Sequence, residues 1–371
     1  MLIKAAVLDK VEATGPYAIT RPLRLTDVVL EPPRPGELLV KIEAAGICHS
    51  DLSVINGDRP RPTPMVLGHE AAATVLSAPN SEHFSEGDKI VLNFLPSCGT
   101  CPECSGGQGY LCGPGSVANA KGELLNGGRR LTRGTEAISH HLGISAFATH
   151  AVVDARSAVK IPDDIHPEIA ALFGCAVLTG VGAVLKTAAL QPTETVAIFG
   201  LGGVGLSALM GAVAGGASKV VVVDPSPEKQ ALATELGATR AFSPDGAIDA
   251  IHAELSGGPS VVVETVGSAT VLEQAYDVAR KGGRIVTAGL PNPAQRLSIQ
   301  ASSLVTEGKT LMGSYMGSSI PRRDVPAYIS MWREGRLPVD RLLSSTGGLE
   351  DLNSMMDDLA AGRVVRQVVI P

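Results

Sequence analysis

The chain has 371 residues, of which 44% are hydrophobic, 18% are charged and only 3% are aromatic, and its formal net charge is −6. This length supports a full hydrophobic core without disulfides, and the acidic balance, with few aromatic residues and no basic stripe, argues against nucleic acid as a partner. The first ten residues, MLIKAAVLDK, have no apolar signal core, so we expect a cytoplasmic protein that acts on a small molecule.

The first part of the chain, residues 1 to about 176, predicts a β-rich domain. It contains short strand-like runs, such as residues 37–43, between turns rich in glycine and proline. Long stretches with helical periodicity are few. Such punctuation by turn residues is typical of a domain built from many short strands.

Three residues of this part are candidates for a catalytic metal site. Cys48, His69 and Cys175 together supply two thiolates and one imidazole, a set that can hold zinc and leave a fourth position open for water or substrate. A lone histidine or buried cysteine is more often structural, so this prediction needs all three residues to meet in the fold. Asp51 and Glu70, each near a ligand in the sequence, are candidates to orient His69 or to tune the charge of the metal.

The other four cysteines lie within fifteen residues, in the pattern C-x2-C-x2-C-x7-C. Four thiolates in a lobe rich in glycine and proline, residues 95–113, favour a closed, structural zinc site. A bacterial ferredoxin run begins alike, but it closes after three residues with a Cys-Pro pair, whereas here the gap is seven and Gly113 follows. Disulfides are the other alternative; thiolates instead imply a reducing compartment. The four residues are Cys98, Cys101, Cys104 and Cys112.

A basic run, residues 128–133, contains three arginines. We expect it to form the solvated face of a loop, with guidance of an acidic substrate as the alternative.

Residues 195–205 form an apolar strand that leads into G-x-G-x-x-G and then into a helical stretch, which predicts a dinucleotide-binding turn. The pyrophosphate would lie at the N-terminus of the helix. The 22 residues Val196–Ala217 carry no charge and could instead form a membrane helix, but seven glycines and the α/β pattern on both sides argue against this. The glycines of the turn are Gly200, Gly202, Gly203 and Gly205.

A second apolar run, residues 219–223, ends in Asp224, nineteen positions beyond Gly205. A carboxylate here can accept hydrogen bonds from the ribose hydroxyls and would repel a 2′-phosphate, which favours NAD over NADP. The next cation is Lys229, which we include among the cofactor-binding candidates. Alternatively, Asp224 caps the following helix.

From residue 195 onward, strand-like and helical runs alternate, which predicts a doubly wound parallel sheet. We expect six strands near 195–199, 219–223, 239–242, 261–265, 284–288 and 310–313, and helices near 204–215, 227–236, 246–256 and 269–281.

These features resemble the zinc-dependent alcohol dehydrogenases of the medium-chain dehydrogenase/reductase superfamily, in their longer, liver-type form. The most specific matches are Cys48-His-Ser-Asp51, Gly68-His-Glu70, the four-cysteine lobe, Gly174-Cys175 and the glycine turn. The resemblance covers the whole chain and implies an α/β protein with a GroES-like catalytic domain (1–176), a Rossmann domain (177–317) and a return to the catalytic domain (318–371). It also implies a homodimer, two zinc ions per chain and NAD.

The resemblance assigns roles to individual residues. Cys48, His69 and Cys175 match the catalytic zinc ligands, the four clustered cysteines match the structural ones, and Ser50 matches the hydroxyl that takes the proton of the alcohol. The remaining matches are His49 and Arg366 for the pyrophosphate, Thr179 and Val204 for the nicotinamide ring, the backbones of Leu290, Ser314 and Met316 for the carboxamide, and Phe94, His141 and Leu142 for the substrate pocket.

Two departures limit what the resemblance implies. Ser53 stands where the liver-type proton relay ends in a histidine, and Ser116 stands where the glutathione-dependent formaldehyde class has an arginine. The implied activity is oxidation of a primary or aromatic alcohol to the aldehyde, and the reverse reduction. A polyol or secondary-alcohol dehydrogenase, a formaldehyde-adduct dehydrogenase and a non-catalytic zinc- and NAD-binding sensor are the alternatives.

Overall fold

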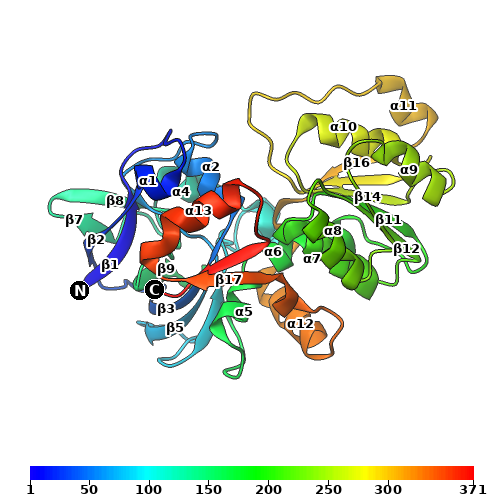
Figure 1. The fold of residues 1–371 in the computed structure, drawn as a ribbon. Helices are drawn as coiled ribbons and strands as arrows, with labels where there is room; N and C mark the ends of the chain where they lie inside the picture. The colour runs from blue at the N-terminus through cyan, green and yellow to red at the C-terminus, as the bar shows by residue number, and fades with distance from the viewer. The chain divides into compact units, whose positions relative to one another are not determined.

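The computed structural model describes residues 1–371, and Figure 1 labels its helices and strands. The chain forms two compact units, which we describe separately. Unit 1 comprises Met1–Cys175, Ile320–Ala327 and Leu343–Pro371, and unit 2 comprises Ala176–Ser319 and Tyr328–Leu342.

Unit 1 is rich in β-structure, as the sequence predicts. One sheet closes into a barrel in the order β1-β2-β7-β8-β4, and a seven-stranded sheet has the order β10-β6-β5-β3-β18-β17, with β9 also paired to β3. Alternate residues of β1, such as Ile3, Ala5 and Val7, fill the core of the barrel because successive side chains of a strand point to opposite faces. The strands are β1 Leu2–Leu8, β2 Leu23–Leu30, β3 Glu37–Ile47, β4 Met65–Val66, β5 Ala71–Ser77, β6 Lys89–Leu92, β7 Leu131–Arg133, β8 Glu136–His140, β9 His150–Asp154, β10 Ala158–Lys160, β17 Leu343–Gly347 and β18 Arg366–Val369.

The helices of unit 1 are short and lie between these strands in the sequence. Proline at the first helical position begins α3, α5 and α12, where its missing N–H costs no hydrogen bond. The helices are α1 Tyr17–Thr20, α2 His49–Ile55, α3 Pro102–Ser105, α4 Gly113–Lys121, α5 Pro167–Leu172 and α13 Leu352–Ala360, together with the first part of α12 Pro321–Arg333.

Unit 2 contains a six-stranded parallel sheet in the order β13-β12-β11-β14-β15-β16. Its valine runs are buried on both faces, as expected for a parallel sheet covered by helices on each side. The expected strands lie within one residue of the observed ones, and the largest helix difference is at the end of α10, predicted at 281 and observed at Val278. The elements are β11 Thr195–Phe199, β12 Lys219–Val223, β13 Arg240–Phe242, β14 Val261–Glu264, β15 Arg284–Thr287, β16 Thr310–Gly313, α6 Ala176–Gly182, α7 Gly203–Ala214, α8 Pro227–Glu235, α9 Ala247–Glu254, α10 Ala269–Val278 and α11 Ala301–Thr306.

The charge-free run Val196–Ala217 forms β11 and α7 rather than a single long helix. No helix of the structure combines the length and apolarity that a membrane span needs.

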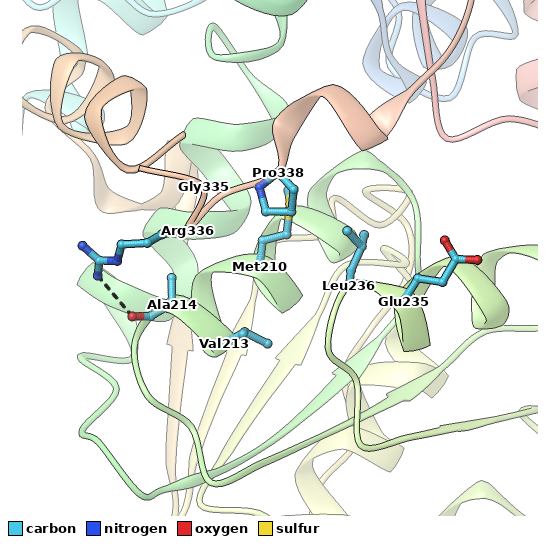
Figure 2. A pocket seen from close by; sticks show the side chains of 8 residues that line it. All are labelled: Met210, Val213, Ala214, Glu235, Leu236, Gly335, Arg336 and Pro338. Atoms are coloured by element: carbon cyan, nitrogen blue, oxygen red, sulfur yellow. Dashed lines mark hydrogen bonds between the residues drawn. The ribbon is translucent and has the colours of Figure 1, made fainter. Parts of the chain in front are cut away.

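The C-terminal segment differs from the expected continuous return to the first domain, because residues 328–342 belong to unit 2. Leu337, Val339 and Leu342 are fully buried there, and the Arg336 guanidinium donates to the backbone oxygen of Ala214 at the end of α7. Figure 2 shows residues of this segment beside residues of α7 and of the end of α8, and together they line a pocket. The pocket is lined by Met210, Val213, Ala214, Glu235, Leu236, Gly335, Arg336 and Pro338.

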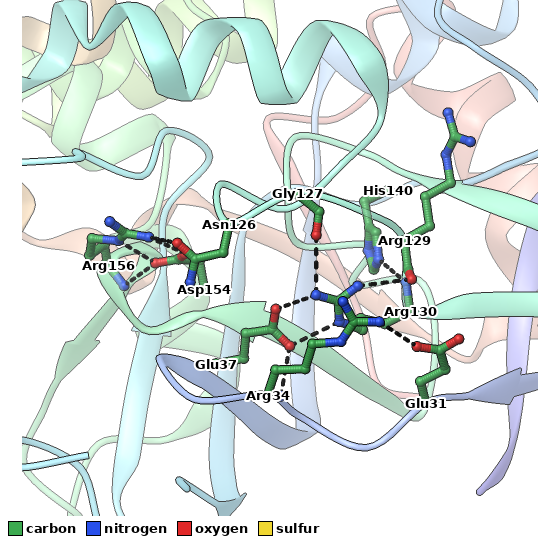
Figure 3. A network of polar contacts seen from close by, with 10 residues as sticks. All are labelled: Glu31, Arg34, Glu37, Asn126, Gly127, Arg129, Arg130, His140, Asp154 and Arg156. Atoms are coloured by element: carbon green, nitrogen blue, oxygen red, sulfur yellow. Dashed lines mark hydrogen bonds and ion pairs between the residues drawn. The ribbon is translucent and has the colours of Figure 1, made fainter. Parts of the chain in front are cut away.

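The basic run at 128–133 is not a solvated loop face, so that expectation was wrong. Arg130 is only 1% exposed, and its guanidinium donates to both carboxylate oxygens of Glu37, at 3.0 and 2.5 Å (Figure 3). It also donates to the backbone oxygens of Arg129 and Gly127. Arg133 donates to the carboxylates of Asp9 and Glu136, so Arg130 and Arg133 both form their hydrogen bonds within unit 1.

His140 belongs to the same network and is held in its neutral form. Its Nε2 accepts the backbone N–H of Arg130 at 3.0 Å (Figure 3). Burial lowers the pKa of His140 to about 3, and the neighbouring charges of Arg130 and Arg129 act in the same direction.

The Glu37–Arg130 pair should stabilise the fold measurably, because removing one partner leaves the other charge buried and uncompensated. Glu37→Gln should lower the free energy of unfolding by about 3 kcal/mol. Asp27→Asn is the matched control, because the Lys4–Asp27 pair has both side chains more than half exposed; its loss should cost no more than about 1 kcal/mol. Urea denaturation of both variants measures the difference, and equal stabilities would contradict this account.

Candidate metal centres and nucleotide site

The four-cysteine lobe brings its sulfurs together. Cys98 and Cys104 have their sulfurs 3.9 Å apart, those of Cys101 and Cys112 are 4.0 Å apart, and all four lie within 4.8 Å of one another. A tetrahedral zinc with Zn–S bonds near 2.3 Å requires S–S distances of about 3.8 Å. No two cysteines form a disulfide, and the geometry fits a single zinc ion.

Backbone N–H groups point at these sulfurs and favour their thiolate forms. Cys98 and Gly115 donate to the sulfur of Cys112, at 3.2 and 3.4 Å, and Cys101 donates to the sulfur of Cys98 at 3.3 Å. Backbone hydrogen bonds from Thr100 and Cys101 lower the pKa of the Cys98 thiol to about 6. Cys98 is therefore held as the thiolate, which is the form of cysteine that binds metal.

A second donor set is formed by Cys48, His69 and Cys175, and all three lie in unit 1. Cys48 directly follows β3, His69 follows β4 after Gly68, and Cys175 follows α5. Their ligand atoms lie within 4.8 Å of one another, with 3.7 Å between the Cys175 sulfur and His69 Nε2, and each residue is less than 10% exposed. Two sulfurs and one imidazole nitrogen fit a zinc site with one open position.

Asp51 holds two of these donors in place. Its Oδ2 accepts the backbone N–H of Cys48 at 3.0 Å, in a capping-box arrangement at the start of α2. Its Oδ1 accepts the backbone N–H of Gly68 and the Nδ1–H of His69, both at 3.1 Å. Because the hydrogen of His69 is on Nδ1, its Nε2 is left as the ligand atom.

The environment keeps this carboxylate charged. Burial alone would raise the pKa of Asp51, but the neighbouring His69, which also donates a hydrogen bond to it, and the nearby His141 ring lower it far below its usual value.

Glu70 does not orient His69, which corrects one of the two roles considered for it. Its Oε1 accepts a hydrogen bond from the Arg366 guanidinium at the start of β18. Gly46 allows this pairing, because a Cβ on Gly46 would lie 2.4 Å from that Glu70 oxygen. The pKa of the Cys48 thiol lies well below its usual value, because Cys175 and His69 hydrogen-bond to it and Arg366 adds positive charge. Glu70 thus positions a cation near the metal ligands.

Ser50 lies beside the donor set, whereas the Ser53 hydroxyl is hydrogen-bonded within α2. The Ser50 hydroxyl oxygen is 3.9 Å from the Cys48 sulfur. The Ser53 hydroxyl donates to the backbone oxygen of His49 one turn earlier in α2, at 2.8 Å. His49 itself is an exposed residue at the start of the same helix.

Two of the three substrate-pocket candidates contact the ring of His69. The Phe94 ring centroid lies 5.9 Å from that of His69, and the His141 centroid lies 5.3 Å from it, both edge to face. Leu142, next in the chain, is buried with a φ of 52°. Burial lowers the pKa of His141, so its ring is neutral at ordinary pH.

The glycine turn of unit 2 has the shape that the motif predicts. Gly200 follows β11 with a φ of 91°, and a Cβ on Gly205 would lie 1.8 Å from the Gly200 oxygen. The chain then enters α7, whose first N–H groups have no partner within the helix and so favour an anion. Asp224, at the end of β12, accepts the backbone N–H of Leu201 at 2.7 Å and that of Ser226 at 2.9 Å.

The other cofactor candidates also lie in unit 2, apart from His49 and Arg366. Thr179 lies in α6, and Val204 lies in the first turn of α7. Leu290 is half exposed, the Ser314 hydroxyl lies 2.7 Å from that of Thr187, and Met316 is buried with a φ of 52°. Lys229 donates its backbone N–H to the Ser226 hydroxyl at the start of α8.

Sequence reasoning missed Glu264, which is buried at the end of β14. Its carboxylate accepts the Gly267 N–H at 2.6 Å and the Thr287 hydroxyl at 2.7 Å, so it ties the loop after β14 to the end of β15. The sequence signal was present, because an acidic residue stands at the end of this apolar run as Asp224 does directly after β12.

Comparison with known proteins agrees with this geometry. The zinc-binding dehydrogenase family matches residues 203–334, and the alcohol dehydrogenase GroES-like domain matches residues 34–163. An NDMA-dependent alcohol dehydrogenase from Amycolatopsis methanolica is 34% identical over 100% of this chain and 99% of its own. The chain belongs to the zinc-binding alcohol dehydrogenases.

Further members of the family are similar over nearly the whole chain. An S-(hydroxymethyl)glutathione dehydrogenase from Synechocystis is 32% identical over 97% of this chain and 99% of its own. The crystal structure of benzyl alcohol dehydrogenase from Acinetobacter calcoaceticus superimposes with a TM-score of 0.93 and 29% identity, covering 100% of this alcohol dehydrogenase and 99% of that chain.

The two donor sets predict distinct effects on metal content. Cys48→Ser should lower the zinc content of the dialysed alcohol dehydrogenase from about two ions to about one per chain and leave its secondary structure intact. Cys112→Ser should also remove one zinc but lower the unfolding temperature, because a closed site contributes directly to folding. Elemental analysis and circular dichroism measure both effects. Unchanged zinc content in Cys48→Ser would contradict the assignment of the second donor set.

Proposed function

We propose that this chain oxidises a primary alcohol, including an aromatic one, to the aldehyde with NAD, and catalyses the reverse reduction. The observation that carries the proposal is the buried Cys48–His69–Cys175 set with Asp51 behind it, in a chain whose second unit has a dinucleotide turn. Two zinc ions per chain fit the two donor sets. Membership of the family also supports a cytoplasmic homodimer.

Each residue of the site has a distinct role in this reaction. When bound, zinc supplies the Lewis acidity that lowers the pKa of an alcohol hydroxyl, and NAD supplies the hydride acceptor. The Ser50 hydroxyl, beside Cys48, accepts the proton of the alcohol while its own proton passes on to water, and Asp51 keeps His69 in the tautomer that binds metal. Phe94 and Leu142, both buried, provide the apolar surface that excludes water and receives the carbon chain.

Three observations favour this activity over its alternatives. Cys175 supplies a second thiolate where polyol dehydrogenases commonly use a carboxylate. Ser116 is an exposed, neutral residue of α4, so the position that would need an arginine for an anionic glutathione adduct carries no charge. A non-catalytic sensor would not need an open metal position next to a serine hydroxyl.

The activity itself is tested by initial rates of NADH formation with zinc-loaded protein. The panel contains ethanol, longer alkanols, benzyl alcohols and sorbitol, each with NAD and with NADP. Because one relative is named as NDMA-dependent, a parallel series uses NDMA as the oxidant. Turnover with primary or benzylic alcohols, lost in Cys48→Ser, is the expected result. Turnover restricted to sorbitol would favour the polyol alternative, and none in either series would favour the sensor.

Asp224 should set the preference for NAD. Asp224→Asn keeps a side chain that can hydrogen-bond but removes the charge, and a hydrogen bond to a charged group is worth about 1.5–3 kcal/mol. The ratio of kcat/KM for NAD to that for NADP should therefore fall at least about tenfold. Glu228→Gln, an exposed acid in the next helix, is the matched control and should leave the ratio unchanged. Equal ratios in wild type and Asp224→Asn would remove Asp224 from the ribose role.

A further inference from the structure

Two histidines share one oxygen of Asp51. Nδ1 of His69 lies 3.1 Å from Asp51 Oδ1, and Nδ1 of His141 lies 3.2 Å from the same atom. All three residues are at most 1% exposed, and the two rings pack edge to face at 84°. A carboxylate can only accept hydrogen bonds, so each histidine interacts favourably with this oxygen only when its hydrogen is on Nδ1.

The Asp51 carboxylate has little spare capacity for a second histidine. It already accepts the backbone N–H groups of Cys48 and Gly68, and an ionised carboxylate offers about four lone-pair sites. The contacts are also unequal: the His69 hydrogen bond is well aligned, whereas Nδ1 of His141 forms no aligned hydrogen bond with any group. The backbone N–H of His141 donates to the Ser145 hydroxyl at 3.1 Å, which anchors the residue in this position.

We propose that His141 is a positioning residue of the catalytic metal site, which acts by competing with His69 for the Asp51 carboxylate. A stronger hydrogen bond from Nδ1 of His69 makes its Nε2 a better donor to the metal. The same donation makes the metal a weaker Lewis acid. By drawing part of the negative charge of Asp51 to itself, His141 lowers metal affinity and keeps the Lewis acidity needed for the reaction.

This inference rests on the catalytic zinc of the proposed function. The inference gives His141 a role that Phe94 cannot have, because Phe94 also lies against the His69 ring but has no polar atom to offer Asp51. A ring without a nitrogen at position 141 would fill the same space without competing for the carboxylate.

The test compares His141→Phe, which keeps a ring but loses the donor, with His141→Gln, which keeps a donor but loses the ring. The dissociation constant of zinc is measured for the full-length, zinc-loaded protein by equilibrium competition with a chelator. The dissociation constant that is missing in Cys48→Ser belongs to the catalytic zinc. The dissociation constant of the four-cysteine site should be the same in all variants and serves as the internal control. His141→Phe should bind the catalytic zinc about 3–10-fold more tightly, less than the 10–100-fold effect of removing a direct partner of a ligand.

His141→Gln should stay within about twofold of wild type, and kcat at saturating alcohol should fall in His141→Phe with the tighter binding. If His141→Phe does not fold, His141→Leu replaces it with the same expectation. Unchanged affinity, weaker binding, or equal behaviour of the Gln and Phe variants would overturn the inference. The inference would also be overturned if wild type held a third metal ion that the His141 variants lacked, because His141 would then be a metal ligand. If wild type holds only the zinc of the four-cysteine site, the proposed function fails as well. Measuring the zinc content of wild type distinguishes this case from failure of the inference alone.

Discussion

The metal centre depends on one buried carboxylate. Asp51 is fully buried, and such a charge is tolerated only when hydrogen bonds replace the lost water. Those hydrogen bonds come from the backbone of Cys48 and Gly68 and from the ring of His69. Satisfying Asp51 therefore places two metal ligands from separate segments at the same time and sets the tautomer of the histidine.

The two donor sets differ in the number of ligands that the backbone brings together, and this number sets whether a bound metal has an open coordination position. In the lobe, four cysteines close in sequence surround one point, and backbone N–H groups stabilise their sulfurs. No position is left for a substrate, so that site can only hold the fold together. In the second set, three ligands come from the ends of a strand, a turn and a helix, and the fourth position stays available for chemistry.

Charged residues that might be assigned to solvent or to a ligand are instead paired inside unit 1. Arg130 lies in a basic run but is buried against Glu37, and Arg366, predicted to hold the pyrophosphate, also pairs with Glu70. Each pair replaces the water that its charges lose on burial. Hydrogen bonds from Cys175 and His69, together with the positive charge of Arg366, lower the pKa of Cys48.

The sequence by itself determined the features whose signals are local. Strand and helix periods, the glycine turn and the spacing of the four cysteines all lie within short windows, and the observed elements follow them closely. Tertiary structure alone decided the contacts between distant residues. Arg130 and Glu37 are 93 positions apart, Arg366 and Glu70 are 296 apart, and Asp51 meets His141 across the fold. Because such pairs leave no periodic trace in the chain, burial and charge pairing could be known only from the structure.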